Sequence, residues 1–405
     1  MGKRLLLALL LGSCILVPLQ AQDNLTFKTF AQFNHRLDSL ANLQDSLQRE
    51  KSLAEFWRQL TETHRIPFTL GDSVAFLFWG NCKTVSWAGD MSGWNPDLPA
   101  LQGLRTGKSH IFRCIQCYPL DARLDYKIVS DGNWILDPAN SWQQFSGFGP
   151  NSELRMPGWV YPTETLERKN IPHGKLSGNL QLVSDSSRLG YRVQYRVYTP
   201  AGYANLSKLP VVYVTDGHEY ADILKGSMVQ VLDNLIAEKK IKPLLAVFID
   251  PRNPEDLSVN RRMKEYTGNP SFVNFLADEL VPAVDSAYRT NRIAGERCIV
   301  GTSLGGWNAA YTGWLRSDRF GLIGIQSPAF DSLIISRYSN AGRLPLKIFM
   351  STGVVHDTEI QARNMKKILD EKGYPLLYRE VNEGHSWGNW RALLDDMLVY
   401  FFGTK

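Results

Sequence analysis

The chain contains little of what marks several protein classes. Its 405 residues include only five cysteines and seven histidines. The close pair Cys114 and Cys117 has no second cysteine or histidine pair that would complete a metal site. The net charge is only +5, and no basic run with interleaved aromatic residues occurs, unlike the usual pattern of nucleic-acid binders. We therefore expect no metal, no organic cofactor and no nucleic-acid partner.

Long apolar runs are also missing. The longest, Leu5–Leu19, falls short of the ~20 residues that cross a bilayer. It follows Lys3 and Arg4 and ends at a small residue, Ala21, as signal peptides do. We expect residues 1–21 to be a signal peptide and the chain to be exported to the periplasm or the extracellular space, with no integral membrane span. Cys14 ends a stretch that also resembles a lipoprotein cleavage box, so a lipoprotein is the alternative.

Four cysteines follow the expected cleavage point. Cys114 and Cys117 fall in an expected strand, where their thiols would face opposite ways. Export permits a disulfide, with Cys82 joined to Cys114 or Cys117. Cys298, in an apolar strand, is expected to be a buried core residue.

The length exceeds one ordinary core, so two folded units with an extension are expected. Residues 22–66 repeat apolar side chains at helical spacing, which predicts a helical extension that docks on the body or pairs with another chain. Short strands in 67–160 predict an all-β sandwich, with a hairpin turn at Asp131-Gly132. Residues 161–178 read as a linker. In 179–405 strands alternate with helices, which predicts an α/β domain with a mostly parallel sheet.

The central motif of this α/β region is Gly301-Thr302-Ser303-Leu304-Gly305. It follows the apolar stretch that begins at Arg297 and precedes an expected helix, Leu304–Leu315. Strand, Gly-x-Ser-x-Gly and helix form the nucleophile elbow of an α/β-hydrolase, in which the serine hydroxyl is exposed on a sharp turn. The glycines remove side chains where strand and helix approach. An ordinary glycine-rich turn is the alternative.

An activated serine needs a base and a third group that orients the base. In this fold the order along the chain is serine, acid, histidine. His385, in a loop after the expected strand Leu377–Val381, is the candidate base, and a surface histidine is the alternative. Asp357 is the candidate acid, although it would also suit the N-cap of a helix starting at Thr358. Glu359 is the second candidate, and a Ser–His dyad remains open.

The oxyanion would be held by two backbone N–H groups. The first belongs to Leu304, directly after the serine. The second is expected after the strand Pro210–Thr215, near Gly217 or His218, where Asp216-Gly217 could equally be a simple turn. Aromatic side chains near these segments would line the substrate pocket or pack in the core: Tyr220, Trp307, Trp387 and Trp390.

Residues 180–402 resemble the putative esterase family, which includes enterochelin esterases, esterase D and carbohydrate esterase family 1. The matching segments are Tyr213–Gly217, Val231–Glu238, Arg262–Tyr266, Phe275–Pro282, the elbow, Phe320-Gly321 and Gly384–Trp387 with Trp390. The resemblance implies an α/β-hydrolase fold with Ser303 as nucleophile, His385 as base and Asp357 as acid. The Asp-Gly at 216–217 looks closest to the enterochelin-esterase branch, which also carries a β-sandwich.

The expected sandwich resembles the immunoglobulin-like module of carbohydrate-binding module family 48 and of glycogen-branching enzymes. The matching segments are Val85–Trp94, Tyr126–Gly132 and Asp137–Asn140. Trp87, Trp94 and Trp134 would stack on pyranose rings or belong to the core.

Together these features predict an exported serine carboxylic-ester hydrolase acting on bulky esters. Its substrate would be either an acyl or feruloyl ester of a polysaccharide or a trilactone siderophore. A non-catalytic glycan-binding protein on a hydrolase scaffold is the alternative. The oligomeric state is left open.

Overall fold

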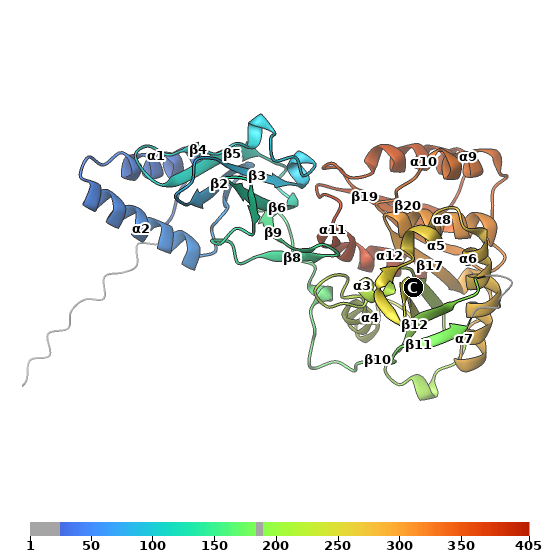
Figure 1. The fold of residues 1–405 in the computed structure, drawn as a ribbon. Coiled ribbons are helices and arrows are strands. Elements are labelled where there is room, and N and C mark those ends of the chain that lie inside the picture. The colour runs from blue at the N-terminus through green and yellow to red at the C-terminus, as the bar shows by residue number, and fades with distance from the viewer. Residues whose placement is uncertain (1–24, 184–188, 405) are drawn as a thin grey trace, which may run out of the picture.

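The computed structural model describes residues 25–183 and 189–404. The expected signal peptide, with Cys14, lies outside these residues. An N-terminal part with two helices and two sheets lies beside a C-terminal α/β part (Figure 1). Within the described ranges, no helix combines the length and apolar character needed to traverse a bilayer.

Twelve α-helices occur in the described residues. They are α1 (Phe30–Ala41), α2 (Ser46–Glu62), α3 (Gly217–Tyr220), α4 (Met228–Ala237), α5 (Arg262–Tyr266), α6 (Pro270–Phe275), α7 (Val281–Ala287), α8 (Leu304–Leu315), α9 (Ser332–Asn340), α10 (Glu359–Glu371), α11 (Trp387–Ala392) and α12 (Leu394–Phe402).

The strands of the N-terminal part are β1 (Phe68–Leu70), β2 (Ser73–Trp79), β3 (Val85–Gly89), β4 (Leu104–Arg105), β5 (Ile111–Cys117), β6 (Arg123–Ser130), β7 (Asn133–Ile135), β8 (Gln143–Ser146) and β9 (Gly149–Arg155). Those of the C-terminal part are β10 (Lys175–Leu176), β11 (Leu180–Val183), β12 (Arg192–Thr199), β13 (Val211–Val214), β14 (Leu245–Asp250), β15 (Arg252–Asn253), β16 (Asp256–Asn260), β17 (Arg297–Thr302), β18 (Leu322–Gln326), β19 (Lys347–Gly353) and β20 (Leu376–Val381).

The N-terminal strands form two packed sheets. One has the order β1-β2-β5-β4, and the other has the order β3-β6-β9-β8 with β7 beside β6. Val74 and Phe76 of β2 face the core between the sheets, whereas Ala75 and Leu77 face the helices. Because β2 is covered on both faces, its sequence is continuously apolar instead of alternating.

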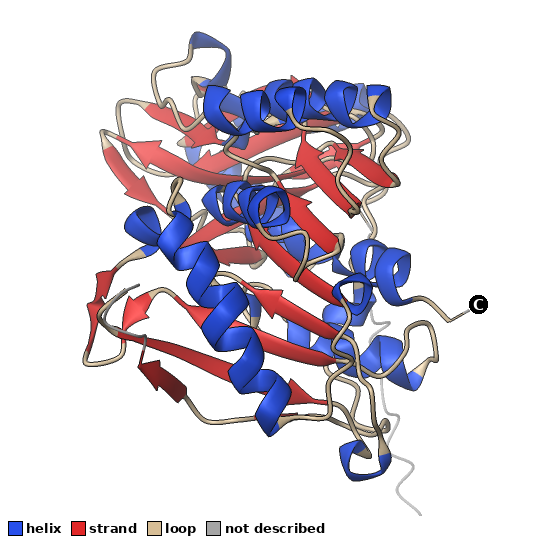
Figure 2. Cartoon of the chain, turned by 90° about the vertical axis from the view of Figure 1, so that its right-hand side faces the viewer, coloured by secondary structure: helices blue, strands red, loops and turns tan. Residues whose placement is uncertain are grey.

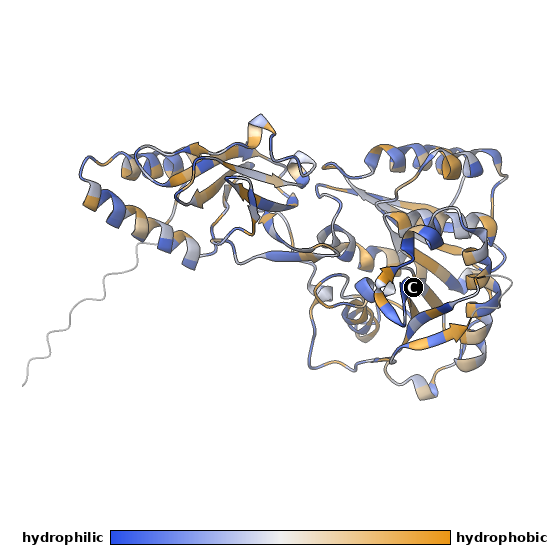
Figure 3. Ribbon diagram, in the orientation of Figure 1, coloured by the Kyte–Doolittle hydropathy of each residue, from blue (hydrophilic) through white to orange (hydrophobic). Residues whose placement is uncertain are grey.

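The helical extension consists of two helices rather than the single one expected. The chain turns after α1, and Asp45 starts α2 by accepting a hydrogen bond from the Gln48 backbone N–H at 2.8 Å. Phe33 of α1 stacks on Phe68 of β1 with ring centroids 3.7 Å apart. Both helices therefore dock on the first sheet, with mixed hydrophilic and apolar faces (Figure 3).

The expected hairpin at Asp131-Gly132 is confirmed. It joins β6 to β7, and both turn residues have positive φ, 45° and 81°, as a two-residue hairpin of this kind requires.

The expected disulfide is wrong. Cys82, Cys114 and Cys117 are all free thiols. Cys114 points into the sandwich core and Cys117 to the exposed side of β5, so the alternation along the strand separates them. Cys298 is buried core, as expected.

The C-terminal sheet has nine strands in the order β10-β12-β14-β13-β17-β18-β19-β20, with β11 beside β12. From β14 to β20 neighbouring strands run parallel, and β12 pairs antiparallel to β14. One apolar core joins the sheet to helices α6 to α10, and the other joins it to α4, α11 and α12. The sheet is thus covered on both faces, as expected for a parallel sheet (Figure 2).

Two helical stretches of this part are interrupted. The first consists of α6, a wide π turn at Leu276–Leu280 and α7. Pro282 in the first turn of α7 has no backbone N–H to donate, which suits such an irregularity. The second is divided at Leu393 into α11 and α12. The expected linker contains the short strand β10.

Candidate active site

Ser303 lies on the sharp turn between the buried strand β17 and helix α8. Its backbone has φ 58° and ψ −119°, a conformation that non-glycine residues adopt only under constraint. The constraint is visible in two hydrogen bonds: the Ser303 N–H donates to the Gln326 carbonyl at 2.9 Å, and the Ala329 N–H donates to the Ser303 carbonyl at 3.1 Å. The chain therefore holds the serine in the geometry expected of a nucleophile elbow.

The two glycines of the motif allow this turn to close. A Cβ on Gly301 would lie 2.3 Å from Thr215 Oγ1 and 2.4 Å from the Gly305 carbonyl carbon. A Cβ on Gly305 would lie 2.7 Å from the same Thr215 oxygen. The motif is therefore a tight junction between β13, β17 and α8, not an ordinary surface turn.

The structure brings His385 and Asp357 into direct contact. His385 Nδ1 donates to Asp357 Oδ1 at 2.6 Å. The Asp357 side chain is fully buried, whereas 36% of the His385 side chain is exposed. A carboxylate on Nδ1 fixes the tautomer in which Nε2 is free to accept a proton. The sequence left Asp357 and Glu359 open, and Asp357 is the one that contacts the histidine.

Asp357 is held in place through its second oxygen. Ser327 Oγ and the Gly353 backbone N–H each donate to Asp357 Oδ2 at 2.6 Å. Asn389 Nδ2 adds a longer bond at 3.4 Å. The predicted alternative, in which Asp357 caps α10, is wrong: Thr358 is the N-cap, and α10 starts at Glu359.

Ser303 and His385 line one cavity of about 310 Å³. No hydrogen bond joins the Ser303 hydroxyl to the His385 ring among the described residues. Such catalytic contacts are commonly long without substrate and tighten when it binds. The cavity lining comes from both parts of the chain: Ser146, Gly147, Phe148, Asp216, His218, Glu219, Asn260, Arg262, Thr302, Ser303, His385, Ser386, Trp387 and Trp390.

The loop expected to supply the second oxyanion donor forms the short helix α3. Its N-cap, Asp216, has φ 51°, and its backbone N–H donates to the Tyr266 hydroxyl at 2.9 Å. Gly217 begins the helix, where a Cβ would lie 2.3 Å from the Phe248 backbone. Gly217 is therefore needed for the packing of α3 on β14.

Arg262 connects this loop to the elbow. Its Nε donates to the Asp216 carboxylate at 2.9 Å, and its Nη2 donates to the Thr302 carbonyl at 3.2 Å. Burial raises the pKa of Asp216 to about 6, while Arg262 opposes the rise. Asp216 is thus a buried carboxyl group that holds the Arg262 side chain at the wall of the cavity.

Two of the aromatic residues expected to line the pocket do not line it. Tyr220 is fully buried, and its hydroxyl donates to Gln326 Oε1 at 2.8 Å. Trp307 is 1% exposed, and its indole N–H donates to Asp331 at 3.0 Å. Both are core residues: Trp307 belongs to the buried cluster with α6 to α10, and Tyr220 belongs to the one with α4, α11 and α12. Trp387 and Trp390 do line the cavity.

Sequence reasoning missed the residues that the β-sandwich contributes. Ser146, Gly147 and Phe148 form the β8–β9 turn and reach the cavity that holds Ser303. Phe148 is 98% exposed. In the sequence, Phe148 is marked only by a glycine on each side, a pattern that predicts a turn and does not indicate a substrate-binding residue. Arg262 had a signal, since it begins one of the family segments.

Ser303 and the His385–Asp357 pair therefore lie together at one cavity of the α/β part. Residues 186–341 match the family model described as putative esterase. The matched segment is less than half of the chain and lies in the α/β part, which is similar to that family.

Three related proteins extend the comparison. An uncharacterized Bacillus subtilis protein, YjcH, is 24% identical over 225 residues, 53% of this chain and 92% of its own. The endo-1,4-beta-xylanase/feruloyl esterase of Xylanibacter ruminicola is 30% identical over 233 residues, 55% of this chain but 31% of its own. The crystal structure of ferric enterobactin esterase from Salmonella typhimurium has a TM-score of 0.69 at 20% identity, covering 81% of this chain and 93% of its own. Because 81% of this chain is more than the α/β part contains, the similarity of fold extends into the sandwich.

Proposed function

We propose that this protein is a serine esterase that cleaves carboxylic esters with a bulky acyl group. The observation that carries the proposal is the joining of His385 to the buried Asp357 at 2.6 Å in the cavity that Ser303 also lines. These residues come from three separate elements, and a nucleophile, a base and an orienting acid are the parts that acyl transfer requires.

In the proposed reaction, His385 Nε2 takes the proton of Ser303 as the hydroxyl oxygen attacks the ester carbonyl carbon. The carbonyl oxygen becomes an oxyanion held by the N–H groups of Leu304 and Gly217, and one such donor is typically worth about 3–4 kcal/mol. His385 then gives its proton to the leaving alcohol. Water repeats the sequence on the acyl-enzyme and releases the acid.

The cavity supports an aromatic acyl ester of a polysaccharide as the substrate. Phe148, Trp387 and Trp390 supply aromatic surface, which suits a hydroxycinnamoyl group. The basic side chains of the lining already face carboxyl groups: Arg262 pairs with Asp216, and His218, whose pKa is lowered by burial, lies 3.4 Å from Asp250. A strongly anionic ferric catecholate would have to displace these partners.

Two exposed tryptophans of the sandwich support a glycan as the alcohol part. The rings of Trp94 and Trp134 lie 6.5 Å apart at an angle of 21°, and the residues are 37% and 44% exposed. Exposed aromatic faces of this kind stack on pyranose rings. Trp87, the third tryptophan considered, is fully buried in the sandwich core. The resemblance of the sandwich to carbohydrate-binding module family 48 remains part of this proposal.

A trilactone siderophore is the second candidate. It is favoured by the likeness in fold to ferric enterobactin esterase over both parts of the chain. We also propose that residues 1–21 direct export. Mass spectrometry of the mature N-terminus would distinguish cleavage after Ala21 from a lipid-modified Cys14.

A panel of methyl ferulate, feruloylated arabinoxylan and ferric enterobactin tests the proposal. We expect release of ferulate by the wild type, with Ser303→Ala as the inactive control. Turnover of ferric enterobactin alone would assign the siderophore class. A protein that hydrolyses none of the three and does not react with a fluorophosphonate at Ser303 would be a binding protein, and the proposal would fail.

A further inference from the structure

The loop that carries His385 is held by a side chain from the other part of the molecule. Arg123, at the start of β6 in the sandwich, has a fully buried side chain. Its Nη1 donates to Glu383 Oε2 at 3.3 Å and to Ser386 Oγ at 3.0 Å. These two residues flank Gly384 and His385, so one guanidinium nitrogen holds the loop on both sides of the histidine.

The backbones of the two parts also meet at this point. The Arg123 N–H donates to the Asn382 carbonyl at 3.2 Å, and Arg123 forms an isolated parallel bridge with Glu383. Asn382 Nδ2 donates to Asp121 at 2.8 Å. The segment before the histidine is therefore paired with the sandwich like a short extra strand.

The contact is closely fitted around two glycines. A Cβ on Gly384 would lie 2.1 Å from Asp90 Cγ, and a Cβ on Gly388 would lie 2.0 Å from Arg123 Cζ. The loop and the first turn of α11 thus lie directly on sandwich side chains. Neither glycine has a positive φ, so close approach and not backbone conformation accounts for them.

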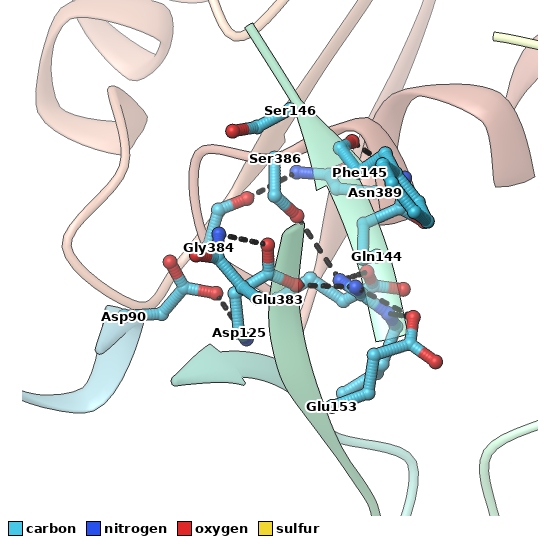
Figure 4. A network of polar contacts seen from close by, with 12 residues as sticks. Asp90, Asp125, Gln144, Phe145, Ser146, Glu153, Glu383, Gly384, Ser386 and Asn389 are labelled. Atoms are coloured by element: carbon cyan, nitrogen blue, oxygen red, sulfur yellow. Dashed lines mark hydrogen bonds and ion pairs between the residues drawn. The ribbon is translucent and has the colours of Figure 1, made fainter. Parts of the chain in front are cut away.

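The remaining nitrogens of Arg123 are bound within the sandwich. Its Nε donates to Glu153 Oε1 at 2.8 Å, and its Nη2 contacts Asp125. Figure 4 shows the carboxyl groups of Asp90, Asp125, Glu153 and Glu383 together with Ser386 and Gly384. The planar guanidinium is thus fixed by the sandwich before it reaches the loop, a geometry that the single ammonium of lysine cannot reproduce.

We propose that Arg123 is a positioning residue for the catalytic histidine, so that the β-sandwich forms part of the catalytic unit and is not only a substrate-binding attachment. This inference rests on the proposed esterase function. The loop is anchored by Asp357 on the hydrolase side and by Arg123 on the sandwich side, and both anchors define where His385 Nε2 lies relative to Ser303.

Steady-state kinetics of the full chain test the inference. Arg123→Lys keeps the charge but loses the planar guanidinium that joins Glu383 and Ser386 to Glu153 and Asp125 of the sandwich. Since displacements near 1 Å can cost about 100-fold in rate, we expect kcat on methyl ferulate to fall by about 10- to 100-fold, with KM within about threefold. The rate of fluorophosphonate labelling at Ser303 should fall in parallel, because it depends on the same base.

Arg155→Lys is the matched control. Arg155 bonds the same Glu153, through Oε2 at 2.9 Å. Its guanidinium lies over the rings of Trp142, Trp159 and Tyr161 and makes no direct contact with the loop within the described part of the chain. We expect this variant to keep its kcat. An equal loss in both variants would mean general damage to the sandwich and would overturn the inference.

Two milder variants keep the test valid if Arg123→Lys does not fold. Glu383→Gln replaces the ion pair of Nη1 with a neutral hydrogen bond, and Ser386→Ala removes the second acceptor of Nη1. We expect smaller decreases in kcat than for Arg123→Lys. Folded variants with wild-type kcat would refute the positioning role, while the esterase assignment would stand. A wild-type protein without esterase activity or labelling would instead refute the proposed function.

Discussion

Replacing Asp357 with asparagine should abolish catalysis by changing the tautomer of His385. Asp357 Oδ2 receives the Gly353 N–H and the Ser327 hydroxyl, both at 2.6 Å. The Ser327 proton is committed to Asp357, because Ser327 Oγ itself accepts from the Trp390 indole at 2.8 Å. An asparagine would therefore place its oxygen at the Oδ2 position and its NH₂ group against His385 Nδ1.

That NH₂ group can only donate, so Nδ1 would have to accept and the ring proton would move to Nε2. The histidine could then no longer take the Ser303 proton. Changes of this kind cost about 10⁴-fold in kcat in serine hydrolases, which corresponds to about 5 kcal/mol of transition-state stabilisation. Because the side chains match in shape, we expect little change in thermal stability.

The assay is kcat on methyl ferulate, with the thermal unfolding midpoint measured in parallel. Glu359→Gln is the control, since Glu359 was the other candidate acid in the sequence, and it should retain wild-type kcat. A kcat for Asp357→Asn within tenfold of wild type would refute the reasoning. A large loss in Glu359→Gln alone would transfer the role to Glu359.

Three further predictions concern the elbow, the cavity wall and the buried carboxyl beside Arg123. Gly305→Ala should lower the free energy of unfolding by about 1–3 kcal/mol in urea and reduce activity, because the new Cβ would lie 2.7 Å from Thr215 Oγ1. Gly342→Ala is the control: open space surrounds Gly342, so neither stability nor activity should change. Phe148→Ala should raise KM for aryl acyl esters by about 2- to 10-fold without lowering the unfolding midpoint, since Phe148 is 98% exposed; an unchanged KM would remove this residue from the substrate wall. Burial raises the pKa of Glu383 from 4.5 to about 7, while Arg123 opposes the rise, so the folded state binds this proton more tightly than the unfolded state does. The contribution of this bound proton to the free energy of unfolding is complete below about pH 4.5 and falls by up to about 3 kcal/mol as the pH rises to 7. Glu383→Gln should therefore show a flatter pH dependence of unfolding than the wild type. An identical pH dependence would contradict the raised pKa of Glu383.

The elements that could be predicted from the sequence were those with a strong local pattern. The parallel strands of the C-terminal part are short apolar runs between turn signals. Cys298 and its neighbours on β17, for example, are buried throughout. The elbow was visible because a sharp strand-to-helix turn needs glycines at fixed spacing around Ser303. Helix interruptions were harder to predict, because the breaks at 42–45 and at Leu393 depend on how each helix docks.

The sequence by itself also determined the order of the candidate nucleophile, acid and base along the chain, because that order follows from the order of the strands. It did not decide which acidic residue meets the histidine. Asp357 and Glu359 are two positions apart, and only the turn after β19, with donors from Ser327 and Gly353, turns Asp357 toward His385.

Only the tertiary structure decided which aromatic residues line the cavity and what the sandwich contributes. Tyr220 and Trp307 lie close in sequence to catalytic elements, yet both point into the core. Arg123 and Ser386 are 263 positions apart, and no local pattern links them. Local preferences specify strands, turns and caps, whereas contacts between distant side chains arise only when the two parts pack against each other.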